Sequence, residues 1–240
     1  MNHIESTSLK MPAIIHASFL RTGGVSALPY ETLNVGENVA DDPQSVQENI
    51  RRCLHILSLS QLAKMNQVHG KKVCAVSKAG DYECDALISN EPQLALMVRH
   101  ADCQPGLLYD PVTESIGAVH AGWKGLTQNI YQETIVAMKA AFDVDPKNLR
   151  AWIGPSLGPE HSEFLNYEEE FPEHLHKFLL PQRHMDLRAI GKQQLIEAGI
   201  LEENIEVSPL CTYEEPGKCF SYRRDGVTGR HGTIIALKGE

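Results

Sequence analysis

The stretch LALMVRHADCQPGLLYDPVTESIGAVHAGWKG, residues 94–125, decides the fold of this chain. It contains three short apolar runs, Leu94–Arg99, Gly106–Tyr109 and Ser115–His120, each bounded by turn-forming residues. Such runs predict consecutive β-strands. After the glycine turn that follows His120, apolar residues recur at helical spacing and predict a long helix, roughly Leu126–Phe142.

The remaining sequence adds strands and helices without a strict strand–helix alternation. Strands are predicted at Ala13–Leu20, Lys72–Ser77, Ala86–Ser89, Leu149–Ile153, Cys219–Tyr222 and Gly232–Leu237. Helices are predicted after Asp42-Pro43, at Tyr167–Leu180, and at Leu187–Ala198 between the cap Asp186 and the stop Gly199. This mixture predicts an α/β (α+β) fold, a mixed-sheet sandwich with flanking helices. No linker or repeat interrupts it, so residues 1–240 are interpreted as a single domain.

Composition restricts the classes of function. The 240 residues are 42% hydrophobic and 22% charged, typical of a soluble globular chain, and the formal net charge is −9. That charge argues against nucleic acid as a partner. Residues 1–10 are polar, and no apolar run approaches the roughly 18–20 residues that span a bilayer. We therefore expect no membrane segment, a cytoplasmic protein, and six cysteines that remain reduced.

His69, Cys103 and His120 are the candidate functional residues. Each lies in a short segment marked by glycine or aspartate: QVHG (67–70), ADCQP (101–105) and HAGWKG (120–125). Two imidazoles and a thiolate suit zinc, with a fourth position open for water or substrate. The same residues also suit a cysteine nucleophile with a histidine base, and the spacing leaves both interpretations open.

Other residues near these segments have weaker claims. Asp102 can orient an imidazole or accept a proton, or simply form a turn. Strand alternation turns His100 away from its odd-numbered neighbours, which disfavours it as a ligand. The chain lacks the glycine-rich phosphate loops, the Gly-x-Ser-x-Gly elbow and the zinc signature of nucleobase deaminases.

Seven motifs in order together resemble the YfiH-type family, once named laccase-domain or polyphenol oxidase proteins and described as purine nucleoside phosphorylases. The resemblance spans nearly the whole chain. The motifs are RTGGVS (21–26) with LNVG (33–36), NQVHG (66–70), DAL (85–87), ADCQP (101–105), DP (110–111), HAGWKG (120–125), and FSYRRDG (220–226) with TGR (228–230).

The resemblance implies a YfiH-like fold and a zinc site formed by His69, Cys103 and His120, with copper less favoured. It implies phosphorolysis of adenosine, inosine, guanosine and methylthioadenosine, and hydrolytic deamination of adenosine. The expected partners are therefore small-molecule purine nucleosides and phosphate. Where the family commonly carries a paired cysteine segment, this chain reads SLGPEH (156–161), so substrate preference or pocket shape is expected to differ there.

Four arginines are candidates for an anion site that would bind phosphate: Arg21, Arg51, Arg224 and Arg230. Three alternatives stay open. A metal-free cysteine hydrolase would use Cys103 and His120, for example in editing peptidoglycan precursors, a role also associated with the family. A copper polyphenol oxidase and a zinc ion that only stabilises the fold are the others. The sequence does not specify an oligomeric state.

Overall fold

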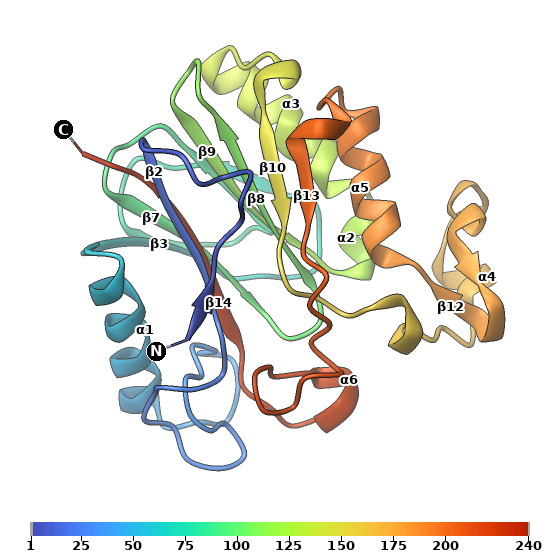
Figure 1. Ribbon diagram of the computed structural model, residues 1–240, viewed down its shortest axis with the longest axis horizontal. Helices are drawn as coiled ribbons and strands as arrows, with labels where there is room; N and C mark the ends of the chain where they lie inside the picture. The colour runs from blue at the N-terminus through green and yellow to red at the C-terminus, as the bar shows by residue number, and fades with distance from the viewer. Residues whose placement is uncertain (1, 240) are drawn as a thin grey trace.

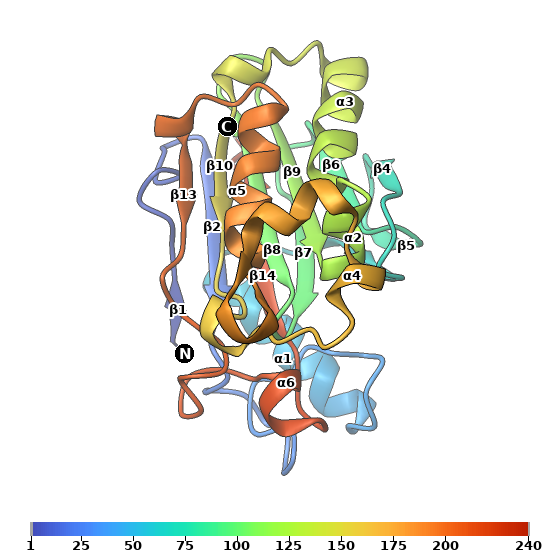
Figure 2. The same cartoon turned by 90° about the vertical axis from the view of Figure 1, so that its right-hand side faces the viewer.

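Two six-stranded mixed sheets lie face to face in the computed structural model, which describes residues 2–239, and helices cover their outer sides (Figure 1, Figure 2). The first sheet has the order β1 (His3–Ile4), β2 (Ile14–Phe19), β14 (His231–Leu237), β7 (Leu94–His100), β3 (Gln61–Met65) and β5 (Gly80–Tyr82). The second has the order β13 (Ile205–Val207), β10 (Arg150–Ile153), β8 (Gln104–Asp110), β9 (Ser115–Ala121), β6 (Ala86–Ser89) and β4 (Val73–Ala75). The predicted mixed-sheet sandwich is confirmed.

The central strands are buried on both faces, which explains their continuous apolar character. In β7, Leu94, Leu96 and Val98 point between the two sheets, while Ala95 and Met97 point to the opposite side. Alternation in β8 likewise sends Leu107 between the sheets and Leu108 outward. Because both faces are covered, every residue of β7, β8 and β9 is buried.

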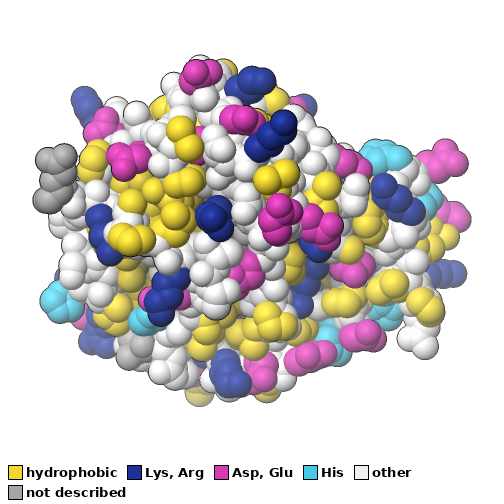
Figure 3. Space-filling model, turned by 45° about the horizontal axis from the view of Figure 1, so that its top comes forward, with side chains coloured by type: hydrophobic (Ala, Val, Ile, Leu, Met, Phe, Trp, Pro, Cys, Tyr) yellow, Lys and Arg dark blue, Asp and Glu magenta, His cyan; other side chains and the backbone are white. Residues whose placement is uncertain are grey.

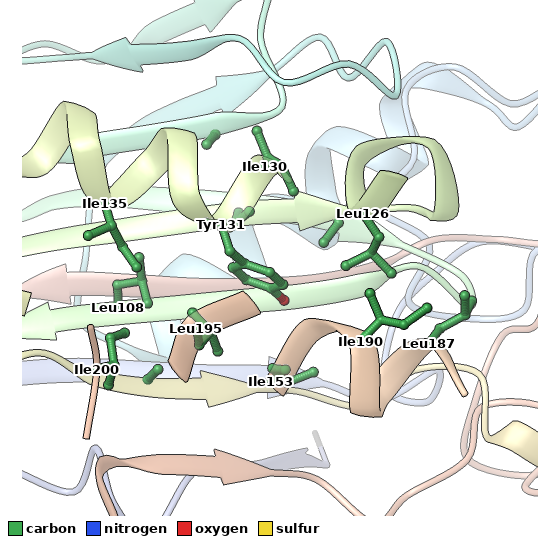
Figure 4. Packing of buried hydrophobic residues seen from close by; sticks show 14 of the residues in the cluster. Leu108, Leu126, Ile130, Tyr131, Ile135, Ile153, Leu187, Ile190, Leu195 and Ile200 are labelled. Atoms are coloured by element: carbon green, nitrogen blue, oxygen red, sulfur yellow. The ribbon is translucent and has the colours of Figure 1, made fainter. Parts of the chain in front are cut away.

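Helices cover the two outer faces. On the first sheet, α1 (Pro43–Ile56) packs its apolar side against the outward residues of β7 and β14. On the second, α2 (Trp123–Thr127), α3 (Ile130–Phe142) and α5 (Leu187–Glu197) pack over β8, β9 and β10. Figure 4 shows Leu108 and Ile153 of this sheet beneath Tyr131, Ile135 and Leu195 of the helices. The order of layers is helix, sheet, sheet, helix.

Several predicted elements differ from the observed ones for identifiable reasons. The long helix predicted at Leu126–Phe142 is two helices, because Asn129 adopts the left-handed conformation, with φ of 58°, and caps α3. The helix predicted at Tyr167–Leu180 is also interrupted: α4 (Tyr167–Glu170) ends before Pro172, and a 3₁₀ segment, Glu173–Phe178, follows.

The strand predicted at Cys219–Tyr222 is wrong. This segment is a loop that leads into α6 (Tyr222–Asp225), whose first turn is capped by the Ser221 hydroxyl. Phe220 packs against His231 of β14, with ring centroids 5.1 Å apart, and the segment joins neither sheet. No strand was predicted at β1, β3, β5 or β13. The hairpin of β11 (Leu179–Leu180) and β12 (His184–Met185) was also missed, and Leu179–Leu180 falls at the end of the helix predicted at Tyr167–Leu180.

The surface carries charges of both signs. On the face in Figure 3, acidic and basic side chains are interspersed among hydrophobic ones, so neither sign forms a continuous area there. Within residues 2–239, no helix has both the length and the apolar character that crossing a bilayer requires.

Candidate metal centre

His69, Cys103 and His120 converge at one end of the second sheet. One donor atom from each, two imidazole nitrogens and the Cys103 sulfur, lie within 4.8 Å of one another. The two imidazole rings meet edge to face, with centroids 4.8 Å apart. His120 is buried, Cys103 is half-buried and His69 is exposed. The cluster is therefore anchored in the protein interior at His120 and accessible to ligands at His69.

Strand register explains the convergence. Gln104 in β8 pairs with Ala121 in β9, and one step further along the same register places Cys103 beside Gly122. Cys103 ends the turn that carries the chain from β7 in one sheet to β8 in the other. His69 lies in the loop before β4, whose parallel partner β6 begins at this same end. The three residues meet because three strand ends meet.

Asp85 holds the two histidines in place. It immediately precedes β6, and the β6–β9 register makes it the cross-strand neighbour of His120. Its fully buried carboxylate accepts a hydrogen bond from His120 Nδ1 at 2.9 Å. It also accepts from the backbone N–H groups of Val68 at 3.2 Å, His69 at 3.0 Å and Gly70 at 2.8 Å. The bond to Nδ1 leaves His120 Nε2 free to bind a metal ion.

Charges within the cluster favour a thiolate. Burial alone raises the pKa of the Cys103 thiol, but the charge of His120 and hydrogen bonds from His120 and His69 outweigh it and lower that pKa to about 6. Burial opposes the protonation of His120, yet Cys103 and Asp85 raise its pKa to about 9. A thiolate between two imidazoles is the form of cysteine that binds metals and the form that attacks electrophiles. The donor set therefore fits a zinc-class ion.

A cavity of about 480 Å³ opens onto the cluster, within the size range of small-molecule sites. His69, Cys103 and Asp102 form its floor, and Trp123 forms one wall. Other lining residues come from distant segments: Leu157, Glu163, Phe164, Leu165, Asn166, Glu170, Leu187, Tyr222 and Arg223. Phe164 packs against Trp123, with ring centroids 6.0 Å apart. The cavity is thus mainly apolar, and its polar groups come from the cluster and from Glu163, Asn166, Glu170 and Arg223.

A second, smaller cavity of about 160 Å³ lies on the other side of His69. Arg99, Arg230 and Glu37 contribute its charges. Glu37 is already neutralised, because its carboxylate pairs with Arg99 at 2.7 Å and Lys64 at 2.6 Å. Arg230 donates only to the carbonyls of Thr228 and Gly229 and has no carboxylate partner within residues 2–239. This cavity therefore presents an unneutralised guanidinium next to the cluster.

The structure brings only one of the four predicted arginines to the two cavities beside the cluster. Arg230 lines the smaller cavity. Arg51 lies on the exposed side of α1 and pairs with Glu48 at 2.7 Å. Arg21 pairs with Glu31, and Arg224 donates to the carbonyls of Thr212, Tyr213 and Cys219 and pairs with Asp225. Arg21 and Arg224 thus tie loops together, and Arg223, which the sequence analysis did not single out, lines the larger cavity.

Two other predicted residues are also accounted for. The Asp102 carboxylate accepts from the Thr212 hydroxyl and the Arg223 backbone N–H, both at 2.6 Å, so it anchors the α6 segment and the imidazole is oriented by Asp85. His100 is buried and its Nε2 lies 2.8 Å from the Thr233 hydroxyl, outside the cluster, as the alternation predicted. The carboxylate partner of His120 was missed, although the DAL motif containing it was noted.

Comparison with known proteins agrees with this geometry. Residues 15–238 match the family model described as multi-copper polyphenol oxidoreductase laccase. The Escherichia coli K12 protein named purine nucleoside phosphorylase YfiH is 34% identical, over 92% of each chain. The chain belongs to this YfiH-type laccase family.

Further relatives cover similar spans. A Deinococcus radiodurans protein named purine nucleoside phosphorylase is 36% identical, over 94% of this chain and 90% of its own. The crystal structure of Neisseria meningitidis protein NMB0706 superimposes with a TM-score of 0.89, at 29% identity, over 100% of both chains. The family therefore shares the whole two-sheet fold.

Replacing Asp85 by Asn tests its role at the cluster. The amide oxygen can still accept a hydrogen bond from His120. The amide NH₂ group, however, is a donor and cannot accept hydrogen bonds from the backbone N–H groups of residues 68–70. We expect zinc affinity to fall about 10- to 100-fold, measured by competition with a chromophoric chelator. Asp110→Asn is the control, because Asp110 is equally buried and accepts two hydrogen bonds at the far end of β8. Equal zinc affinity in both variants would contradict the role of Asp85.

Gly122 tests the space around the cluster. A Cβ at this position would lie 3.0 Å from the His69 ring and 3.1 Å from the Cys103 sulfur, while its backbone is unstrained. We expect Gly122→Ala to displace one of these donors and to reduce the zinc retained after gel filtration. Gly217→Ala is the matched control, because a Cβ there meets nothing within 4 Å. Unchanged zinc content in Gly122→Ala would show that the cluster does not depend on this close contact.

Proposed function

We propose that this protein is a metal-dependent purine nucleoside phosphorylase that also deaminates adenosine. The observation that carries the proposal is the apolar cavity of about 480 Å³ whose floor includes His69 and Cys103. Relatives with more than 30% identity over nine-tenths of the chain are named purine nucleoside phosphorylases, which supports the same assignment. Adenosine, inosine, guanosine and methylthioadenosine are the proposed substrates.

The larger cavity suits a nucleoside. Trp123 and Phe164 offer aromatic surfaces on which a purine ring can stack. Glu163 and Glu170 line the same cavity and have no ion-pair partner among residues 2–239, so their carboxylates can accept hydrogen bonds from ribose hydroxyls. This arrangement would bring the ribose–base bond toward the cluster at the floor.

The smaller cavity suits phosphate. Arg230 can bind phosphate oxygens bidentately and has no carboxylate partner among residues 2–239, whereas the charge of Arg99 is already paired with Glu37. Both cavities include His69, so phosphate and nucleoside would meet there. In phosphorolysis an oxygen of hydrogen phosphate forms a bond to ribose C1′ and the bond from C1′ to the purine nitrogen breaks. The leaving base takes up a proton in exchange for the one that the phosphate gives up. The positive charge that develops at C1′ is stabilised by the phosphate that Arg230 would hold in place.

His69, Cys103 and His120 would hold the metal, for which zinc is proposed. A bound zinc ion supplies Lewis-acid chemistry, polarising substrate oxygens and activating water for deamination. Asp85 keeps Nε2 of His120 directed at the ion, and the Trp123 wall limits access of bulk water. Copper is the metal named in the family description, and the same two-histidine, one-cysteine set can bind a single copper ion.

A metal-free cysteine hydrolase is the second candidate. The observation in its favour is the Cys103 thiol, whose pKa is lowered to about 6 by His120 and His69 despite its burial. In such an enzyme Cys103 would attack an amide or ester carbonyl and His120 would protonate the leaving group. Chelation distinguishes the two candidates, because only the metal-dependent enzyme loses activity with its metal.

The deciding assay follows adenosine by chromatography, with and without phosphate. We expect adenine only when phosphate is present, inosine in either case, and loss of both products after chelation and in His120→Ala. His174→Ala, an exposed histidine outside the cluster, is the control. Full activity in His120→Ala would contradict the proposal, and activity that survives chelation would favour the hydrolase.

Arg230→Gln tests the phosphate site. Loss of charge-assisted hydrogen bonds is expected to raise the KM for phosphate about tenfold or more, with little change in the KM for inosine. Arg230→Lys should recover part of the loss, because it restores the charge without the bidentate geometry. Arg51→Gln is the control, since Arg51 lies on α1 away from both cavities. An equal rise in both KM values would indicate a structural role for Arg230.

A further inference from the structure

A second cluster of metal-binding side chains lies outside the proposed active site. His161, Cys211 and Glu214 each place one donor atom within 4.8 Å of the others, and none of them belongs to the first cluster. His161 ends a 3₁₀ turn, Pro159–His161, while the other two lie in the loop between β13 and α6. One nitrogen, one sulfur and one oxygen donor therefore meet between two segments that are distant in sequence.

The donors are held in position by their surroundings. The His161 ring stacks on Tyr213, with centroids 4.0 Å apart and ring planes 16° apart. This stacking fixes the imidazole with its Nε2 3.2 Å from a Glu214 oxygen. The Cys211 side chain is buried, the His161 side chain is 29% exposed and the Glu214 side chain is 54% exposed. An ion would thus be anchored from the cysteine side and reached by solvent from the glutamate side.

The Cys211 sulfur is held in a defined position by the groups around it. Its sulfur accepts the backbone N–H of Gly158 at 3.2 Å, a bond that stabilises negative charge on sulfur. Gly158 permits this approach, since a Cβ there would lie 3.0 Å from the sulfur. The Arg188 guanidinium is fixed nearby by the carbonyls of Ser156, Pro209 and Leu210. These contacts hold the sulfur and the residues around it in a fixed arrangement.

We propose that His161, Cys211 and Glu214 form a second metal site, of the zinc class, that fastens the wall of the larger cavity. Histidine, cysteine and glutamate are the ligands zinc takes in proteins, and a water molecule completes the tetrahedron. The segment that carries His161 also provides Glu163 and Phe164 to the cavity. The segment that carries Cys211 and Glu214 leads to Tyr222 and Arg223 on the same wall. The ion would link these two segments through its coordination bonds.

The test is the number of metal ions per chain. The full-length protein is incubated with excess zinc, freed of unbound metal by gel filtration, and measured by mass spectrometry of the metal. We expect His161→Ala and Glu214→Gln each to lower the zinc content by one equivalent per chain. This loss is separate from any equivalent lost in His120→Ala, so combining His161→Ala with His120→Ala should remove both. His174→Ala is the control, because that histidine is exposed and outside both clusters.

Cobalt gives a second measurement that reports the ligand itself. Each cluster contributes one thiolate, so the thiolate-to-cobalt absorption band of the cobalt-loaded protein should lose about half its intensity in Cys211→Ser. Cys74→Ser, a half-buried cysteine outside both clusters, is the control. The site would be overturned if His161→Ala left the zinc content unchanged and Cys211→Ser left the cobalt band unchanged. His161 and Glu214 would then form only a surface ion pair.

Discussion

The Asp85 carboxylate is the interaction on which the rest of the site depends. It is removed from water and accepts four hydrogen bonds, one from His120 and three from the consecutive N–H groups of residues 68–70. A buried carboxylate without such partners would cost several kcal/mol, so the loop that carries His69 is drawn to this position by the need to satisfy it. One side chain thus fixes the rotamer of one histidine and the backbone of the other.

The strand pairing within the second sheet places that carboxylate next to His120. Asp85 faces His120 across the β6–β9 ladder, and the chain crosses between the two sheets through residues 101–103. Asp102 occupies this crossing with a φ of 89°, a conformation that costs free energy and is sustained by its bonds to Thr212 and the backbone of Arg223. The turn that presents Cys103 is therefore stabilised by the segment that also forms the cavity wall.

Sequence patterns predicted the parts of this structure that depend on local order. Alternation and turn residues located the central strands, and the chemistry of His69, Cys103 and His120 singled them out before any register was known. The role of Asp85 depends on the pairing of β6 with β9. The register of that pairing cannot be determined from the sequence alone, so the role of Asp85 was not predicted. Arg223 and Arg224 are adjacent in one motif, yet only Arg223 lines the cavity, because the carbonyls that hold Arg224 come from a loop folded beneath it. The break at Asn129 was missed, although asparagine both tolerates the left-handed conformation and caps helices, as it does here.

The placement of the two cavities constrains any reaction at the cluster. The larger cavity is apolar and aromatic, the smaller carries unneutralised positive charge, and His69 is common to both. An apolar wall favours a flat heterocycle, whereas a guanidinium favours an anion. Each of the two reactants would therefore bind in a different cavity before they meet. His69 is also the most exposed of the three donors, which leaves the cluster accessible from both cavities. A reaction between an anion and a sugar-linked base is the chemistry that this geometry would accommodate, since each reactant would reach the same cluster from its own cavity.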